Sequence, residues 1–266
     1  MSDFYVGYLP KAPTALARFV RRVIVLLGLV AVAVALALVT GQMPFANSAF
    51  EYGKMRGFEG IIEARPYPML LVARPGQIGS GAKHSRYLLV AKGKHGADNI
   101  VAGFDGKEVR LKGQLIYRES EAMIEIEPGS IAALNGLPAP DGPTVDIGAV
   151  TVTGEIVDSK CYLGVMNPGN GKVHRDCAAR CISGGIPPIF VSLDGEEQFL
   201  LVGPDGNAVA PDALREFVAE PITMTGEALR RGETRMLRVD MVRLRHASAR
   251  VEAALRSSKP RTKEQP

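Results

Sequence analysis

The chain has 266 residues, 46% of them hydrophobic and 23% charged, a mixture that suits one or two compact domains and excludes a disordered or collagen-like polymer. The net charge of +4 is concentrated at the ends: residues 1–22 carry +3 and residues 243–266 carry +5, which leaves −4 on residues 23–242. A mildly acidic body gives no electrostatic reason to bind nucleic acid, so we expect no nucleic-acid partner.

The first predicted element is a transmembrane helix over residues 23–41, an apolar run that directly follows Arg18, Arg21 and Arg22. A single run of this length excludes a multi-pass transporter or channel. Basic residues beside such a run stay on the cytoplasmic side. We therefore expect a bacterial inner-membrane protein with residues 1–22 in the cytoplasm and the C-terminal domains in the periplasm. A cleaved signal peptide is the alternative, but the run exceeds the usual 7–15 apolar residues.

Two copies of one unit follow the apolar run. The sequence YLLV at 87–90 reappears as FLLV at 199–202, and residues 109–126 overlay 222–239, with Gly113 matched to Gly226. Further upstream, Gly60 lines up with Gly154. These matches keep their order and spacing, apart from about 18 extra residues between the first two strands of the second copy. Their collinearity indicates an internal repeat.

Each copy is predicted to be β. Apolar and polar residues alternate with the two-residue period of half-buried strands, as at Val150, Val152 and Ile156. In the second copy, Asp194-Gly195 predicts a hairpin turn, and a Pro-Asp pair at 211–212 starts a short helix. Strand, hairpin, helix and hairpin predict a small five-stranded barrel of the OB type.

The expected fold class is therefore mainly β: an N-terminal transmembrane helix and two tandem OB-like barrels, the second with a helical Cys/His insertion. We place the first OB-like domain at residues 57–134 and a Pro/Gly-rich linker at 135–148. The second OB-like domain then covers 149–246, and a basic tail covers 247–266. The tail is expected to be solvated, with contact to acidic headgroups or a partner as the alternative.

All three cysteines lie in the extra segment of the second copy. Cys161 is expected to end the first strand, and His174, Cys177 and Cys181 come after it with spacings of three and four residues. If residues 174–181 are helical, the last three share one face, since residues three and four apart are helical neighbours. Gly-Gly at 184–185 then ends the helix and Pro-Pro at 187–188 starts the next strand.

Three thiols and one imidazole form a Cys3His set that suits a tetrahedral soft-ligand metal, zinc or copper, more than an iron–sulfur centre. Two alternatives stay open. In an oxidising compartment two cysteines can form a structural disulfide, which leaves one spare thiol. The thiols can also be a redox pair in which His174 lowers the pKa of a cysteine.

Residues beside this set are candidates for a supporting role. Asp158 and Lys160 precede Cys161: charges at a strand end are usually solvated, but a carboxylate here can hydrogen-bond His174 and orient its ring towards a metal. Met166 can serve as a soft ligand for copper, although methionine more often fills gaps in a core.

The segment 152–191, with D-x-x-C at 158–161 and H-x-x-C-A-x-x-C at 174–181, resembles a group of bacterial membrane-anchored envelope proteins. That group places the same pattern on a small OB-like domain, and no reaction is established for it. The resemblance implies export and a shared importance of Cys161, His174, Cys177 and Cys181. It does not extend to the apolar run or to the first copy.

No catalytic signature accompanies these residues, because G-x-S-x-G, H-E-x-x-H, a Walker loop and C-x-x-C-H are all absent from the sequence. The sequence therefore favours a non-enzymatic role. We expect an accessory or assembly subunit of a membrane redox complex that holds a metal, with other subunits of that complex as partners. The alternatives are a scaffold stiffened by a disulfide and a thiol oxidoreductase.

Overall fold

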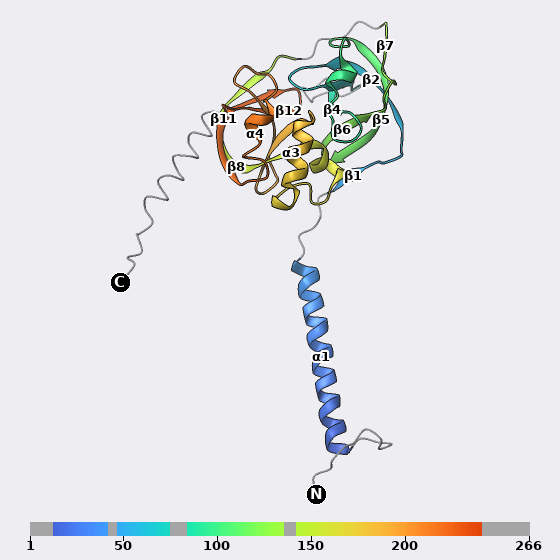
Figure 1. Ribbon diagram of the computed structural model, residues 1–266, viewed down its shortest axis with the longest axis vertical. Helices are drawn as coiled ribbons and strands as arrows, with labels where there is room; N and C mark the ends of the chain where they lie inside the picture. The colour runs from blue at the N-terminus through green and yellow to red at the C-terminus, as the bar shows by residue number, and fades with distance from the viewer. Residues whose placement is uncertain (1–12, 42–46, 75–83, 136–141, 241–266) are drawn as a thin grey trace, which may run out of the picture. The chain divides into compact units, whose positions relative to one another are not determined.

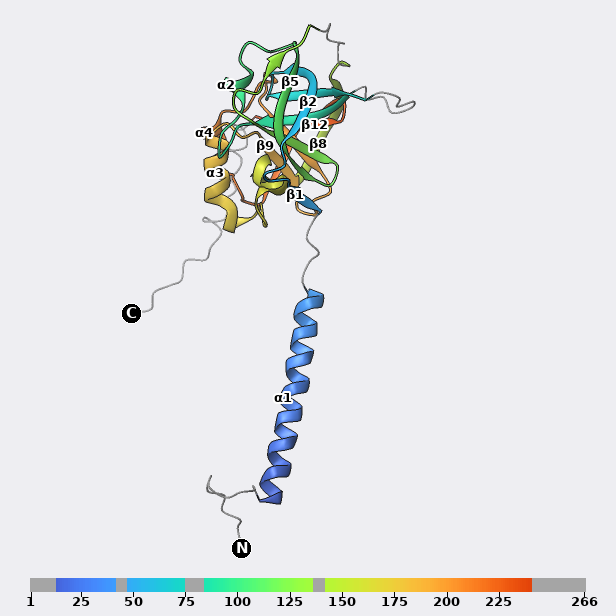
Figure 2. The ribbon, with the colours of Figure 1, turned by 90° about the vertical axis from the view of Figure 1, so that its right-hand side faces the viewer.

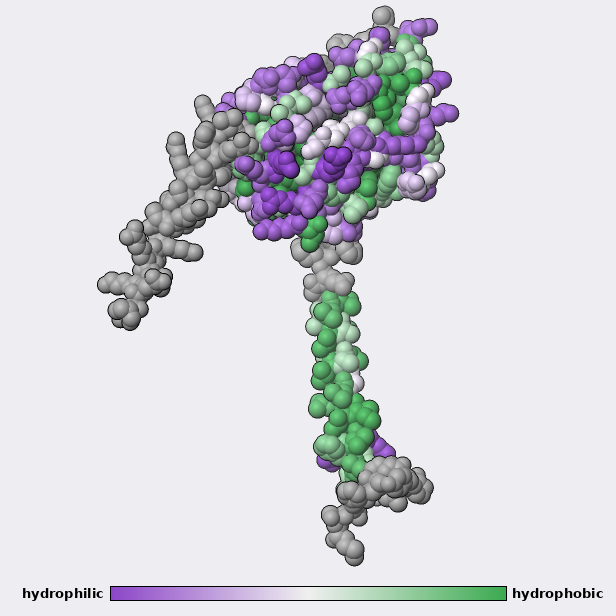
Figure 3. All heavy atoms as spheres, viewed as in Figure 1, coloured by the Kyte–Doolittle hydropathy of each residue, from purple (hydrophilic) through white to green (hydrophobic). Residues whose placement is uncertain are grey.

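The computed structural model describes residues 13–41, 47–74, 84–135 and 142–240, and the chain divides into two units, Met1–Ala46 and Asn47–Pro266. The expected basic tail at 247–266 lies outside the described residues. In the first unit, the helix α1 (Thr14–Gly41) has 28 residues and spans about 42 Å at the usual rise. Its surface is apolar along most of its length (Figure 3). By length and composition α1 can cross a membrane, although a signal sequence has the same properties.

Helix α1 begins before the expected start at residue 23. The Pro13 carbonyl accepts the first helical hydrogen bond from the Ala17 N–H, at 2.9 Å. Pro13 lies directly before the helix, where its missing N–H leaves no donor to satisfy. The helix therefore includes the three arginines that precede the apolar run.

The first barrel lies in the second unit and is closed by five strands in the cyclic order β2-β3-β4-β6-β5. These strands are β2 (Arg56–Glu63), β3 (Met69–Ala73), β4 (His84–Val90), β5 (Glu108–Arg118) and β6 (Glu121–Ile126). A short helix, α2 (Asp98–Val101), lies between β4 and β5. Two short strands, β1 (Ser48–Phe50) and β7 (Ala132–Ala133), also pair with β5.

The second barrel is closed in the corresponding order, β8-β9-β10-β12-β11. Its strands are β8 (Val145–Asp158), β9 (Pro188–Ser192), β10 (Gln198–Val202), β11 (Ile222–Arg231) and β12 (Thr234–Arg238), with the helix α4 (Pro211–Leu214) between β10 and β11. In both barrels the third and fifth strands pair in parallel and the other pairs are antiparallel. The described part of the chain thus confirms a mainly β fold with two five-stranded closed barrels.

The connection between β8 and β9 contains further structure. A π-helical turn, η1 (Cys161–Val165), is followed by a 3₁₀ turn, η2 (Lys172–His174), and by the helix α3 (Arg175–Ser183). Both ribbon views place α3 beside α4 (Figures 1 and 2). Between the equivalent strands of the first barrel, β2 and β3, there are only residues 64–68.

Two glycines in each barrel mark places where strands cross closely. A Cβ on Gly60 would overlap the Leu71 carbonyl oxygen, and a Cβ on Gly154 would overlap the Val191 carbonyl oxygen. The same holds for Gly113 and Gly226, which face the backbones of β6 and β12. Glycine is therefore needed at these crossings, since any other residue would push the strands apart.

An apolar interface joins the barrels. Each barrel has its own core, and a third buried cluster combines residues of both, such as Met69, Ile116 and Met123 with Leu163 and Ile189. Buried Tyr67 spans the interface: its hydroxyl donates to the Leu201 carbonyl at 2.9 Å and accepts the Val209 N–H at 3.1 Å. Glu63 of the first barrel also pairs with Arg231 of the second, at 2.6 Å.

The ends of the strands differ in detail from the expected domain limits. Strand β8 begins at Val145, within the range expected for the linker, and β1 precedes residue 57. The expected hairpin at Asp194-Gly195 joins β9 to β10, with Gly195 in the left-handed region at φ 76°. The short helix expected after Pro211 is α4.

Candidate metal centre

Cys177 and Cys181 lie one turn apart on α3. Ala178, Ala179 and Arg180 favour a helix, and Asp176 in the first turn complements the positive end of the helix dipole. Its buried residues Ala178, Cys181 and Ile182 follow the spacing of an amphipathic helix. The helix ends at Gly184, whose N–H donates to the carbonyls of Arg180 and Cys181 at 3.1 and 3.0 Å. This helix therefore presents two thiols on adjacent turns.

Cys161 meets these two thiols from the start of η1. The sulfur atoms of Cys161, Cys177 and Cys181 all lie within 4.8 Å of one another, and the Cys161 and Cys177 sulfurs are 4.0 Å apart. A tetrahedral zinc site with Zn–S bonds of about 2.3 Å has S–S edges of about 3.8 Å. The three sulfurs are thus spaced much as thiolates around one metal ion would be.

The structure contains no disulfide. All three cysteines are free, and the 4.0 Å separation of the Cys161 and Cys177 sulfurs is about twice the length of an S–S bond. Cys161 and Cys181 are buried, whereas Cys177 is partly exposed. The scaffold alternative, which needs a bridge, is therefore not the state that the structure describes.

His174 and Asp158 form a second group that includes Cys161. The Asp158 side chain is fully buried, and its Oδ2 lies 3.1 Å from His174 Nε2. Its Oδ1 accepts the Cys161 N–H at 2.8 Å. The ligand atoms of Asp158, Cys161 and His174 all lie within 4.8 Å of one another. The structure thus has two overlapping sets of three possible ligands that share Cys161.

The buried Asp158 carboxylate holds both Cys161 and His174 in place. It holds the backbone at Cys161 and the imidazole of His174, which is 3% exposed. Metal-bound imidazoles usually donate their second ring nitrogen to a carboxylate in this manner. Asp158 is therefore placed to orient His174. Because the Asp158 side chain is buried, the alternative of a solvated charge at the strand end does not hold.

Lys160 is buried as well, but its side chain points to the first barrel. Its ammonium donates to the carbonyls of Ala91 and Gly93 at 2.8 and 2.6 Å and pairs with Glu125 at 2.5 Å. The side chains of Lys160 and Glu125 are 4% and 8% exposed. Lys160 therefore attaches the segment before Cys161 to the other barrel.

Lys94, from the loop after β4, is a member of the site that the sequence did not indicate. Its ammonium donates a hydrogen bond to the Cys177 sulfur at 3.1 Å, although the two residues are 83 positions apart. No motif surrounds Lys94, and only the packing of the barrels brings it to the thiols.

Of the other candidates, Met166 is 46% exposed, and its backbone N–H donates to the Cys161 carbonyl at 3.2 Å.

The thiols and Lys94 influence one another electrostatically. The pKa of Cys161 is raised mainly by a hydrogen bond with Cys181 and, to a smaller extent, by burial. The same hydrogen bond lowers the pKa of Cys181. The hydrogen bond to Cys177 raises the pKa of Lys94. Cys181 is thereby favoured as a thiolate, the form in which a cysteine binds metal.

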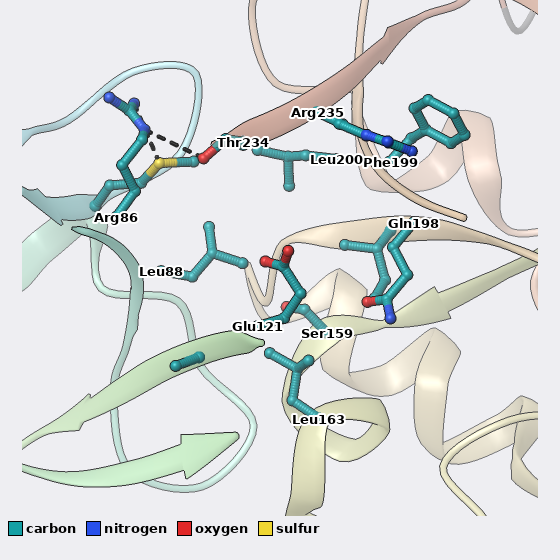
Figure 4. Close-up of a pocket in the computed structure, with 13 residues that line it drawn as sticks. Arg86, Leu88, Glu121, Ser159, Leu163, Gln198, Phe199, Leu200, Thr234 and Arg235 are labelled. Atoms are coloured by element: carbon teal, nitrogen blue, oxygen red, sulfur yellow. Dashed lines mark hydrogen bonds between the residues drawn. The ribbon is translucent and has the colours of Figure 1, made fainter. Parts of the chain in front are cut away.

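A separate cavity of about 50 Å³ lies between the barrels (Figure 4). Its wall includes Leu88 and Glu121 of the first barrel and Ser159, Leu163 and Gln198 of the second. Ser159 Oγ is buried and has no hydrogen-bond partner among the described residues. The volume has room for a few water molecules, and no cysteine lines it. The metal-binding residue types are thus gathered at the thiol cluster and not at this cavity.

No family model, curated protein or solved structure matches the chain. The chemistry therefore has to be inferred from the donor atoms themselves. Three sulfurs, with an imidazole and a carboxylate alongside, could hold a metal ion. Sulfur and imidazole donors suit zinc or cuprous copper, and oxygen-preferring ions such as magnesium are disfavoured.

Proposed function

We propose that the chain is a membrane-anchored periplasmic protein that holds one zinc or copper ion through Cys161, Cys177, Cys181 and His174. The observation that carries this proposal is the convergence of three free thiols within 4.8 Å of one another. One buried thiol pair could be ordinary packing, but three sulfurs at metal-site spacing, next to a carboxylate-bound imidazole, have a common use as ligands.

A holding role fits this site better than catalysis. With four protein ligands bound, a tetrahedral ion has no open position, whereas catalytic zinc keeps one for water or substrate. Cys161, Cys181 and His174 are 4%, 1% and 3% exposed, which leaves access mainly at Cys177. We therefore propose an accessory or assembly subunit that stores or delivers the ion to a membrane redox complex.

The proposed location follows from α1 and the residues before it. The apolar helix is long enough to span a bilayer, and the arginines at its N-terminal end favour a cytoplasmic N-terminus. The barrels would then lie in the periplasm, where free thiols tend to be oxidised. A bound metal would keep the three thiols reduced in that compartment.

We further propose that the barrels are OB-like and arose by duplication. The equal cyclic strand orders, the parallel pairing of third and fifth strands, and the glycines at matching crossings support this proposal. OB barrels serve many functions, so this fold does not identify a ligand. The acidic body of the chain gives no support for nucleic-acid binding.

Elemental analysis of full-length protein purified from membranes tests the metal-holding role. We expect about one zinc or copper ion per chain, together with its loss in Cys177→Ala and its retention in Met166→Ala. Thiol counting under denaturing conditions without reductant should give three free thiols. Absence of stoichiometric metal, with a single free thiol, would instead establish the disulfide scaffold.

Thiol redox chemistry is a second candidate because a partly exposed Cys177 lies beside a buried Cys161. Their sulfurs would need to approach from 4.0 Å to about 2.05 Å to form a bond. A redox role predicts exchange between these two cysteines and a disulfide-containing substrate. Failure of the metal-free protein to exchange with such a substrate would remove this candidate.

A further inference from the structure

One loop of the first barrel, residues 91–96 between β4 and α2, contacts the site at three points. Its carbonyls at Ala91 and Gly93 accept hydrogen bonds from Lys160, the residue before Cys161. Lys94 Nζ donates to the Cys177 sulfur at 3.1 Å. The loop thus reaches both segments of the second barrel that carry the cysteines.

The third contact lies directly after Cys181. The Gly96 N–H donates to the Gly184 carbonyl at 2.9 Å, just past the C-terminal end of α3. A Cβ on Gly184 would overlap the Lys94 carbonyl oxygen, and a Cβ on Gly96 would overlap the Gly185 carbonyl oxygen. The two backbones are therefore too close for a side chain or a water molecule between them. Gly184 and Gly185 end the helix, and because they have no side chains they also let residues 94–96 pack directly against them.

The buried pair of Lys160 and Glu125 fixes the loop's position from the other side. Glu125 lies on β6 of the first barrel, and Lys160 holds this carboxylate and two loop carbonyls with one ammonium group. A buried ammonium with three acceptors is satisfied and is costly to displace. Lys94 is consequently attached to a backbone that is held at both ends against the site.

We infer that Lys94 is a positioning residue that completes the metal site from the first barrel by hydrogen-bonding the Cys177 thiolate and compensating its charge. This inference rests on the proposed metal-holding function. Three thiolates and a neutral imidazole give a net charge of −1 with Zn²⁺ and −2 with Cu⁺. One ammonium at the exposed edge offsets one unit of that charge. Charge-assisted hydrogen bonds of this kind are among the stronger ones in proteins.

Lys94 acts where the site is most open to attack. Cys177 is the partly exposed member of the thiol cluster, so a competing chelator would reach this ligand first. The ammonium of Lys94 lies 3.1 Å from its sulfur and holds that sulfur in place, which opposes its release from the ion. The hydrogen bond from Lys94 should therefore slow the loss of the metal ion. Its removal should also change the electronic environment of one thiolate, that of Cys177.

Nearby Lys92 offers a matched control. It lies on the same loop and is exposed like Lys94, but its ammonium pairs with Glu127 at 2.7 Å and no thiol contact links it to the site. Lys94→Met and Lys92→Met each remove one lysine charge from the same loop, so a comparison of the two isolates the contact with Cys177. Lys94→Arg keeps a cationic donor at the position of interest.

The experiment uses full-length protein in detergent, with Co²⁺ as a spectroscopic probe and Zn²⁺ for release kinetics into a chromogenic chelator. We expect Lys94→Met to release Zn²⁺ about tenfold faster than the wild type and to shift the sulfur-to-cobalt charge-transfer band. Lys94→Arg should restore both readouts towards wild-type values. Lys92→Met should leave both unchanged.

The possible failures are distinguishable. Equal release rates and identical charge-transfer bands for Lys94→Met and Lys92→Met, in a protein that binds metal, would overturn the role of Lys94 alone. A wild-type protein that binds neither Co²⁺ nor Zn²⁺ would overturn the proposed function and this inference together. If Lys94→Met changed only the melting temperature, with an unchanged band and release rate, the lysine would be structural and the inference wrong.

Discussion

The two barrels have the same cyclic strand order but differ in the connection between their first two strands. In the first barrel this connection is residues 64–68, and in the second it is residues 159–187. The short connection contributes Tyr67, which hydrogen-bonds the backbone of the other barrel. The long one contributes the three thiols and His174. Barrels of the same strand order thus differ in this connection: one connection docks on the other barrel, and the other carries the thiol cluster.

The difference also shows why the first barrel matters to the site. The long connection packs against β5 and β1 of the first barrel, where Arg118 donates to the Tyr162 carbonyl at 2.7 Å and its guanidinium lies 4.1 Å from the Tyr162 ring centroid. Gly164 lies close against the Ala49 backbone. Residues on either side of Cys161 are therefore held by the other barrel. The comparison predicts that weakening the contact between barrels should disturb the thiols.

The largest effect should come from Lys160→Met. This change leaves the Glu125 carboxylate buried without its partner, and we expect a loss of about 3–5 kcal/mol in the free energy of unfolding. Guanidinium unfolding of the full chain, followed by near-ultraviolet circular dichroism, measures it. Lys92→Met breaks a solvent-screened pair with Glu127 and should change the stability far less than Lys160→Met.

A double change sharpens that test. Adding Glu125→Gln to Lys160→Met removes the uncompensated charge and should recover part of the lost stability. Metal content should fall in Lys160→Met more than in Lys92→Met, because Lys160 precedes Cys161 in the chain. Equal stabilities for Lys160→Met and Lys92→Met would mean that the pair is solvated and that the barrels are not joined through it.

The next largest effect tests the similarity of the barrels themselves. Gly60→Ala and Gly154→Ala place a methyl group against a carbonyl oxygen of the neighbouring strand, and each should cost about 1–3 kcal/mol of stability. Gly57→Ala on β2 is the control, since its Cβ would meet no atom within 4 Å. Thermal unfolding of the three variants measures the costs. A neutral Gly154→Ala beside a destabilised Gly60→Ala would break the correspondence of the two crossings.

A smaller effect, on metal affinity, is expected for Asp158→Asn. The amide can still accept the Cys161 N–H but cannot offer His174 a charged acceptor, so the imidazole loses its fixed orientation. Removing such a partner typically weakens metal binding about 10–100-fold. Competition with a chelator of known affinity measures the change. Asp146→Asn on the exposed part of β8 should bind metal like the wild type.

Part of this site can be read from the sequence, and part cannot. Cys177 and Cys181 were predicted to face one way because a four-residue spacing is a local property of a helix, and α3 carries both. Asp158 was named as a carboxylate that can orient His174 because metal-bound imidazoles usually need one, with a solvated strand end as the alternative. The alternation of apolar residues likewise predicted strands in the second copy, and the internal sequence match extended the β assignment to the first.

Contacts that depend on docking were missed. Lys94 and Lys160 act across the interface between the barrels, and no local pattern specifies which carbonyl or sulfur they reach. The strand β1 has three residues and gains its pairing only from β5, so its sequence shows no period. The first four residues of β8 were assigned to the linker because Pro and Gly immediately precede them.

The smallest effect should come from Tyr67→Phe, which removes the hydrogen bonds to the Leu201 carbonyl and the Val209 N–H. We expect a loss of about 1–2 kcal/mol of stability at neutral pH, with exposed Tyr52→Phe as the neutral control. Burial raises the pKa of Tyr67, so the folded chain keeps a proton that the unfolded chain releases. The contribution is complete below about pH 10 and falls as the pH rises above it.

Phenylalanine has no such proton to lose. The stability of Tyr67→Phe should therefore fall less steeply above about pH 10 than that of the wild type, and the gap between the two should narrow. Urea unfolding at a series of alkaline pH values measures both curves. A gap that did not narrow with pH would mean that the Tyr67 hydroxyl ionises at least as readily in the folded chain as in the unfolded chain. The hydroxyl would then not be buried against the second barrel, and the docking task assigned to residues 64–68 would be wrong.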